Sequence, residues 1–187
     1  MKLNKKHISN ILLVLFVALL IIPQTRKPIQ VGLHSVLTLF SPSITDLENR
    51  NQLSNYDWQL LDNSGNQFDF NKTKGNVIFV NLWATWCPPC IAEMPSMQKI
   101  YDDYGNKVVF LFVSNEDINI TTSFLERKEL SIPLFSPLSS NPIEISSKSI
   151  PATYIIDKNG FIVVEKTGAA NWNSDSIREL LDSLLIE

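Results

Sequence analysis

The sequence predicts one α/β domain built on a sheet with a parallel part and an antiparallel part, and three observations support this prediction. Of the 187 residues, 44% are hydrophobic and 19% are charged, which is typical of a chain that folds around a core. Residues 77–83 and 108–113 are nearly continuous apolar runs, as in strands that are covered on both faces. Segments with helical spacing follow both strands, and this alternation indicates an α/β architecture.

The individual elements are justified by spacing and by turn residues. Asn63-Ser64-Gly65 and Asp157-Lys158-Asn159-Gly160 are turn formers between β-prone pieces, so each indicates a β-hairpin. Gly105 lies where the first helix of the domain is expected to end. In chain order we expect a hairpin over 58–70, a strand over 77–83, a helix over 88–104, a strand over 108–113, a helix over 119–130, a hairpin over 152–164 and a helix over 174–185.

Residues 1–26 have the features of a transmembrane anchor. Three lysines precede the 19 uncharged positions 7–25, which as a helix would span roughly 28 Å, close to a hydrocarbon core of about 30 Å. A cleaved signal peptide shares the basic and apolar regions, but the run ends in Leu19-Leu20-Ile21-Ile22-Pro23, without the small residues that cleavage requires. We therefore expect a single-pass protein of the cytoplasmic (inner) membrane, with the main domain on the extracytoplasmic or periplasmic side.

Residues 27–54 are interpreted as a juxtamembrane segment and linker, and residues 55–187 as the domain. The apolar stretch 29–40 lies either against the membrane surface or on the domain, and Ser41 to Tyr56 is polar. Residues 1–40 carry five basic and no acidic side chains, so a net charge of -3 for the chain leaves -8 for the rest. An acidic main domain has the wrong sign for wrapping a phosphate backbone or lying on anionic lipid, which disfavours nucleic-acid binding.

The two cysteines of the chain lie at the predicted junction of strand and helix. Their sequence is Cys87-Pro88-Pro89-Cys90, and prolines suit the first helical turn because its N–H groups lack intrahelical partners. The free N–H groups and the helix dipole favour the thiolate of Cys87. We expect Cys87 to attack a partner disulfide and Cys90, one turn along and more buried, to resolve the mixed disulfide.

Two other uses of this cysteine pair are weaker. A tetrahedral metal site needs about four ligands, and the two histidines, His7 and His34, lie in or near the anchor. A purely structural disulfide over so short a loop gains little loop-closure entropy. Neither a metal nor an organic cofactor is therefore expected, and the redox-active group would be the Cys87–Cys90 disulfide.

The run from Phe79 to Cys90, FVNLWATWCPPC, together with Glu93-Met94-Pro95, resembles the thioredoxin superfamily and in particular its TlpA/ResA/CcmG-like membrane-anchored thiol-disulfide oxidoreductases. The resemblance covers about residues 55–187 and implies a thioredoxin fold: a central mixed sheet flanked by helices, with an N-terminal β-hairpin. Ile150-Pro151-Ala152-Thr153-Tyr154 matches the family's loop in which a cis proline faces the redox pair. There Pro151 would present the backbone of Ile150 to a substrate strand, and Trp86, Pro88 and Pro89 would contact the substrate.

The resemblance also implies a proton-transfer role for Glu93. A carboxylate beside a dithiol raises the thiol pKa and exchanges protons with it, although a glutamate in a first helical turn also complements the helix dipole. The chain has Asn81 where thioredoxin itself has a buried aspartate, so Glu93 or water would take the proton of the resolving thiol. Trp83 and Trp86 would shield the pair, unless they are only core residues.

The function that this resemblance implies is the reduction of disulfides in exported proteins, with c-type apocytochromes as one class of substrate. Electrons would come from a transmembrane donor of the DsbD/CcdA type. A disulfide-forming oxidase is the first alternative, because the Pro-Pro dipeptide does not set the redox direction. A peroxidase is disfavoured by Ala84, which stands where peroxiredoxins have a threonine. A copper-carrying module is disfavoured because no histidine follows His34, and a purely adhesive module would not need Cys87 and Cys90.

Overall fold

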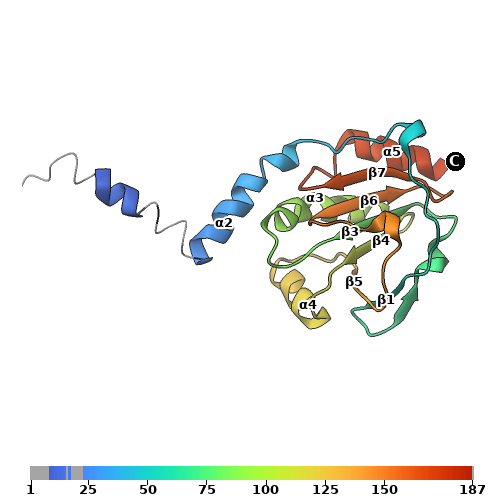
Figure 1. Ribbon diagram of the computed structural model, residues 1–187, viewed down its shortest axis with the longest axis horizontal. Coiled ribbons are helices and arrows are strands. Elements are labelled where there is room, and N and C mark those ends of the chain that lie inside the picture. Colours follow the sequence, from blue (N-terminus) through green and yellow to red (C-terminus); the bar gives the residue numbers. More distant parts are fainter. Residues whose placement is uncertain (1–8, 16, 18–22, 187) are drawn as a thin grey trace, which may run out of the picture.

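The computed structural model describes residues 9–15, 17 and 23–186, and its centre is a seven-stranded sheet (Figure 1). The strands lie in the order β2-β1-β5-β4-β3-β6-β7. β3 and β4 pair in parallel, as do β4 and β5, while the remaining pairs are antiparallel. The predicted mixed sheet is confirmed. The strands are β1 Gln59–Asp62, β2 Gln67–Asp69, β3 Ile78–Leu82, β4 Val109–Val113, β5 Leu134–Pro137, β6 Ala152–Ile156 and β7 Ile162–Thr167.

Four longer helices accompany the sheet, and three of them were expected. They are α2 Pro23–His34, α3 Pro88–Tyr104, α4 Ile118–Arg127 and α5 Asp175–Ile186. Short 3₁₀ turns are η1 Leu37–Leu39, η2 Leu47–Asn49, η3 Phe70–Thr73 and η4 Ile143–Ile145. Residues 9–15 are also helical. The chain was not expected to form α2, because Pro28 lies inside it and Gly32 near its end.

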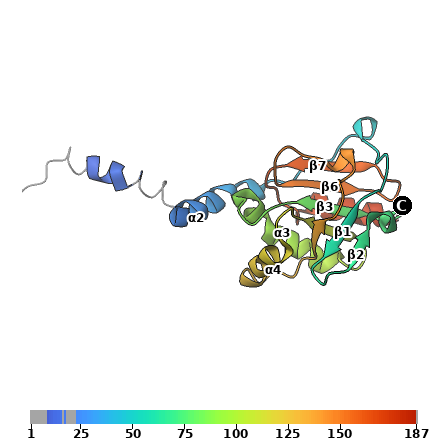
Figure 2. The same ribbon diagram turned by 60° about the horizontal axis from the view of Figure 1, so that its bottom comes forward.

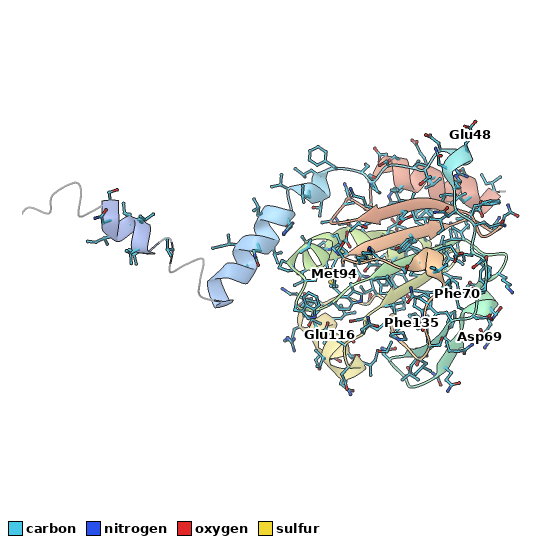
Figure 3. All side chains as sticks on the ribbon, in the orientation of Figure 1. Glu48, Asp69, Phe70, Met94, Glu116 and Phe135 are labelled. Carbon is cyan, nitrogen blue, oxygen red and sulfur yellow. A yellow bond between two sulfur atoms is a disulfide. The ribbon has the colours of Figure 1, made fainter. Side chains whose placement is uncertain are left out.

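Two hydrophobic cores lie on the two faces of the sheet. Buried side chains of α3, α4 and α5, such as Met94, Phe124 and Leu181, pack in the core that also contains Cys87 and Cys90. The other core contains Trp58, Phe70 and Phe135 together with the alternate residues of the central strands. In Figure 3, Met94 lies among the side chains of α3, and Phe70 and Phe135 lie on the opposite side of the domain. The helices therefore build one core, and hairpin and loop segments cover the other.

Helix α3 ends where a side chain would not fit. Gly105 caps it with its N–H donating to the carbonyl of Tyr101 at 2.8 Å. A Cβ atom on Gly105 would come within 2.7 Å of both the ring and the carbonyl oxygen of Tyr101. A glycine is required here because of this close approach and not because of its backbone conformation, since its φ of -61° is an ordinary helical value.

Part of the segment expected to be a linker runs along the edge of the sheet. Thr45 N donates to Val163 O at 2.9 Å, and Leu53 N donates to Gly160 O at 2.9 Å. Gln52 and Phe161 form an isolated antiparallel bridge. Backbone pairing thus holds residues 45–53 beside β7, although the side chains of this segment are mostly polar.

Strand β5 was missed by the sequence analysis. It is four residues long, follows Pro133 and ends in Pro137, so neither its length nor its composition gives a strand pattern. Its place between β1 and β4 is fixed instead by pairing with both neighbours.

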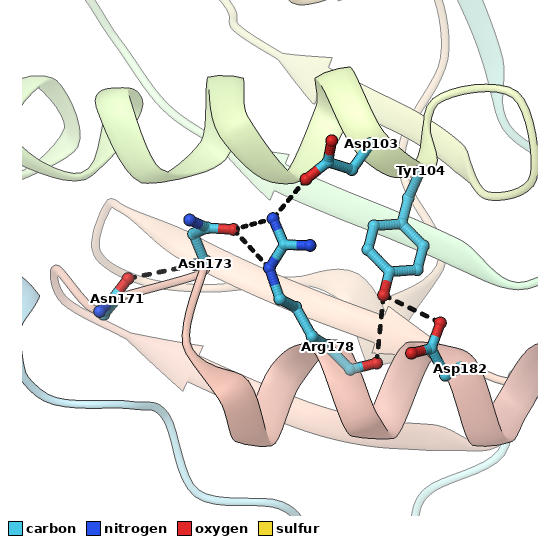
Figure 4. A network of polar contacts seen from close by, with 6 residues as sticks. All are labelled: Asp103, Tyr104, Asn171, Asn173, Arg178 and Asp182. Atoms are coloured by element: carbon cyan, nitrogen blue, oxygen red, sulfur yellow. Dashed lines mark hydrogen bonds and ion pairs between the residues drawn. The ribbon is translucent and has the colours of Figure 1, made fainter.

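The closing helix α5 is fixed to α3 by a polar network as well as by its apolar side chains (Figure 4). Arg178 contacts Asp103 and donates from its Nη2 to Asn173 Oδ1 at 2.6 Å. Tyr104 donates its hydroxyl proton to Asp182 Oδ1 at 2.9 Å. These contacts hold α5, and the loop before it, in register with α3.

Helix α2 lies beside α3 in both ribbon views, outside the sheet domain (Figures 1 and 2). Within the described residues, no helix combines the length and the apolar character needed to span a bilayer. Of the expected anchor, residues 1–26, positions 1–8, 16 and 18–22 fall outside the described residues.

Candidate active site

Cys87 and Cys90 form a disulfide at the start of α3, with Cα atoms 5.3 Å apart. Cys87 occupies the N-cap position, and its Sγ accepts the backbone N–H of Cys90 at 3.3 Å. Pro88 and Pro89 fill the first two helical positions, as expected. Both cysteines are buried, at 3% and 1% exposure, so burial barely distinguishes them in the oxidised form.

The loop before the disulfide is held at both ends. Trp83 N donates to Val113 O at 3.1 Å, and Cys87 N donates to Ala84 O at 3.2 Å. Glu116, seen beside α4 in Figure 3, accepts from the backbone N–H of Thr85 at 2.6 Å and from its hydroxyl at 2.8 Å. The strand β3 therefore delivers the cysteines at a fixed position at the end of the sheet.

The Ile150–Pro151 peptide bond is cis, as the resemblance implied. Pro151 directly precedes β6, whose first residue, Ala152, pairs with Leu82 at the end of β3. Ile150 packs against the core that contains both cysteines. The sheet thus brings the Ile150–Pro151 loop and the cysteine loop to the same end.

A cleft of about 370 Å³ opens beside this end of the sheet. It is lined by residues of both loops, Trp86 and Ile150, and by Trp83, Asn115, Glu116 and Ser147. Trp86 is 59% exposed, whereas Trp83 is buried and packs on Phe124. Of the two tryptophans expected to shield the pair, Trp83 is therefore a core residue and Trp86 faces solvent.

Glu93 follows Cys90 by one turn of α3, and its side chain is completely buried. Three donors surround its carboxyl group. Asn81 Nδ2 donates to Oε1 at 3.1 Å, while Trp172 Nε1 and Ala170 N donate to Oε2 at 2.9 and 3.2 Å. Asn81 Nδ2 also contacts Thr153 Oγ1 at 2.8 Å.

Burial and hydrogen bonding act in opposite directions on this carboxyl group. Removal from water penalises the charged form and raises the pKa of Glu93, the hydrogen bonds from Trp172, Ala170 and Asn81 lower it, and the net result is a pKa raised to about 8. Burial is the larger effect. A carboxyl group that titrates near neutral pH next to a dithiol is suited to accept and return a proton.

Trp172 is the residue of this site that the sequence analysis missed. It lies in the loop between β7 and α5, is completely buried, and packs edge-on against Phe79. A single tryptophan within the polar run Asn171-Trp172-Asn173 was the available signal, because a buried indole N–H normally has an acceptor. The acceptor, Glu93, lies 79 positions away in the sequence and could not be identified from spacing.

Within the described part of the chain, no group of three or more His, Cys, Asp or Glu side chains is arranged to hold a metal ion. The chemistry available at this end of the sheet is thiol chemistry with an adjacent carboxyl group. A mixed sheet that presents a vicinal cysteine pair at a helix start, next to a cis-proline loop, defines a thioredoxin-fold dithiol protein.

Comparison with known proteins agrees with this class. The redoxin family matches residues 41–181. The chain is 33% identical to the thiol-disulfide oxidoreductase ResA of Halalkalibacterium halodurans over 112 residues, which are 58% of this chain and 64% of that protein. It is 30% identical to ResA of Geobacillus thermodenitrificans over 132 residues, covering 68% of this chain and 74% of that protein. It spans just under two thirds of the first of these relatives.

Solved structures show the same fold. A thiol-disulfide oxidoreductase from Bacteroides vulgatus, 32% identical, superposes with a TM-score of 0.54 over 67% of this chain and 90% of that one. A thiol:disulfide interchange protein DsbE from Chlorobium tepidum, 19% identical, superposes with a TM-score of 0.60 over 72% and 98%. The chain belongs to the redoxin family of the thioredoxin superfamily and is a TlpA/ResA-like member of it.

The stability of the oxidised protein is expected to decrease between about pH 5 and pH 8. The pKa of Glu93 is raised on folding to about 8, so in this window the folded state retains a proton that the unfolded state has lost. The free energy of unfolding then falls by at most about 1.4 kcal/mol per pH unit. Urea unfolding at several pH values measures this slope. Glu93→Gln is the control, and equal slopes for both proteins would contradict the assignment.

Trp172→Phe is expected to raise the pKa of Glu93 further, because the indole hydrogen bond favours the carboxylate. The measurement is the titration of the Glu93 carboxyl carbon by NMR in the oxidised protein. Trp58→Phe is the matched control, since Trp58 is also buried but its Nε1 has no hydrogen-bond partner among the described residues. A pKa that is unchanged in Trp172→Phe, or equally shifted in both variants, would show that Trp172 does not act on Glu93 through its N–H.

Proposed function

We propose that this chain is a thiol-disulfide oxidoreductase that reduces disulfides of exported proteins on the extracytoplasmic side of the membrane. The observation that carries the proposal is the bonded Cys87–Cys90 pair at the start of α3, brought by the sheet to the same end as the Ile150–Pro151 loop. The ResA relatives are named thiol-disulfide oxidoreductases, which supports the same reaction here.

The reaction proceeds through two exchanges. In the reduced protein, the Cys87 thiolate attacks one sulfur of the substrate disulfide, forms a mixed disulfide and releases the other substrate sulfur as a thiolate. Cys90 then loses its proton and attacks Cys87 Sγ, which releases the second substrate thiol and restores the Cys87–Cys90 bond. The substrate gains two electrons and the protein loses two.

Glu93 in its ionised form is proposed to take the proton of Cys90 in the second exchange. It lies three residues after Cys90 on α3, and burial raises its pKa to about 8, close to that of a thiol. An amide at position 81 cannot accept this proton as a carboxylate would. Asn81 instead donates to Glu93, so its role in the proposal is to hold the carboxyl group in place.

The substrate is proposed to bind as an extended segment on the backbone of Ile150, with Trp86, Pro88, Pro89 and Pro151 as its other contacts. The cleft lined by Trp86 and Ile150 gives such a segment room beside the disulfide. Exported proteins that must keep their cysteines reduced, such as c-type apocytochromes, are the proposed substrate class. The disulfide is returned to the dithiol by a transmembrane dithiol donor of the DsbD/CcdA type.

Substitution of the two cysteines is expected to separate their roles. Cys87→Ser removes the attacking thiolate and abolishes reduction of a model protein disulfide. Cys90→Ser allows the attack but not its resolution, so a mixed disulfide accumulates and is seen as a slower band on a non-reducing gel. Accumulation in the Cys87 variant instead would reverse the assignment.

The reduction potential of the full-length chain in detergent distinguishes the reductase from the disulfide-forming oxidase. A potential well below about -200 mV is expected for the reductase, and a potential near -120 mV would make the chain an oxidase. Equilibration with a dithiol buffer followed by thiol labelling gives this value, and the Cys87→Ser variant defines the labelling background.

A further inference from the structure

Helix α2 and the turn after it have two faces of different character. On one side, Pro28, Val31 and Gly32 line a groove of about 620 Å³ together with Thr85, Ile91 and Phe124 of the domain. Helix α2 packs against α3. Thr85 lies two residues before Cys87, and Ile91 directly follows Cys90, so the docking site is next to the redox pair.

The other side of this segment is apolar and exposed. Ile29 and Leu33 are one turn apart in α2, and Leu33 is 70% exposed. The turn η1 that follows has no buried residue. The exposed apolar side chains of the segment are Ile29, Leu33, Val36, Leu37, Leu39 and Phe40. A row of this size on a helix already docked by its other side is expected to contact an apolar medium.

We propose that residues 28–40 lie in the surface of a lipid bilayer, with Ile29, Leu33 and the η1 side chains inserted at the boundary of headgroups and acyl chains. The proposal concerns this segment and does not depend on the direction of the thiol chemistry.

Two features favour lipid over a protein partner. The segment follows directly on the apolar run that ends at Ile22, and Arg26 and Lys27 lie between the two in the sequence. Arg127 and Lys128 are also exposed, but they line the groove on the docked side of α2, and the chain beyond residue 40 is acidic overall. An exposed apolar row that directly follows basic residues in the sequence is the pattern of an amphipathic segment on anionic lipid.

The backbone gives this segment a fixed attachment to the domain. The carbonyl of Phe40, the last residue of the segment, accepts from Asn171 N at 2.9 Å. Asn171 is next to Trp172, whose indole contacts Glu93. A bilayer that holds residues 28–40 would therefore also set the height of the Cys87–Cys90 pair above the membrane.

The test is the depth of a nitroxide label on the full-length chain in vesicles of phosphatidylcholine and phosphatidylglycerol. Leu33→Cys is labelled while Cys87 and Cys90 are in their disulfide, and its accessibility to oxygen is compared with that to a water-soluble nickel complex. We expect the label about 5–10 Å inside the headgroup region, with oxygen favoured over nickel. Ile143→Cys, on a residue that is 76% exposed far along the chain, is the control and is expected to favour nickel.

Each other result would overturn the proposal. A label at position 33 that favours nickel as strongly as the label at position 143 places the segment in water. Protection of position 33 from both reagents, with spin–spin broadening, places a second copy of the chain on this face. A second variant tests the insertion independently. In a chain with Leu39→Cys labelled, the added Ile29→Ser substitution is expected to move the label toward water. An unchanged label depth would contradict insertion of the exposed apolar side chains.

Discussion

The arrangement of this site depends on one constraint: a carboxyl group that is fully removed from water must be given hydrogen-bond donors. Glu93 receives three donors from two separate parts of the chain, namely Asn81 on β3 and Ala170 and Trp172 in the loop before α5. Because the donors and Glu93 itself belong to different elements, α3, the sheet and the β7–α5 loop must be aligned before Glu93 can be buried. The contacts of Arg178 and Tyr104 hold α5 to α3 and so keep that loop in place.

The fold was largely predictable because its decisive elements carry local signals. Burial of β3, β4 and one face of α3 requires apolar residues at regular positions along each element, and these patterns can be recognised in the sequence. β5 could not be found because it is short and flanked by prolines, and its stability comes from two neighbours that are distant in sequence. Helix α2 was missed because local propensity opposes it at Pro28 and Gly32, while its docking on α3 favours it.

The candidate site, like the fold, could be predicted from the sequence only in part. The cysteine spacing at a predicted strand–helix junction predicted the thiol chemistry, while Glu93 and the cis Ile150–Pro151 bond were reached through a family resemblance. Neither the cysteine spacing nor the family resemblance predicted the hydrogen bond between Trp172 and Glu93, since it joins α3 to the distant β7–α5 loop. Asn81 illustrates the limit of reasoning by residue type. From the sequence, the conclusion was only that an amide cannot accept the proton of the resolving thiol. In the structure its amide group donates to Glu93 and contacts Thr153.

The position of α2 also constrains the orientation of the Cys87–Cys90 pair relative to the N-terminal segment of the chain. A dithiol on a flexible tether would meet a membrane donor and an exported substrate in any orientation. Docking of Val31 and Gly32 beside Thr85 and Ile91 instead fixes the start of α3 relative to the segment that leads to the N-terminal apolar run. The cleft that contains Trp86 and Ile150 shares no lining residue with the groove beside α2, so a substrate in the cleft and the segment 28–40 would contact different residues around the disulfide.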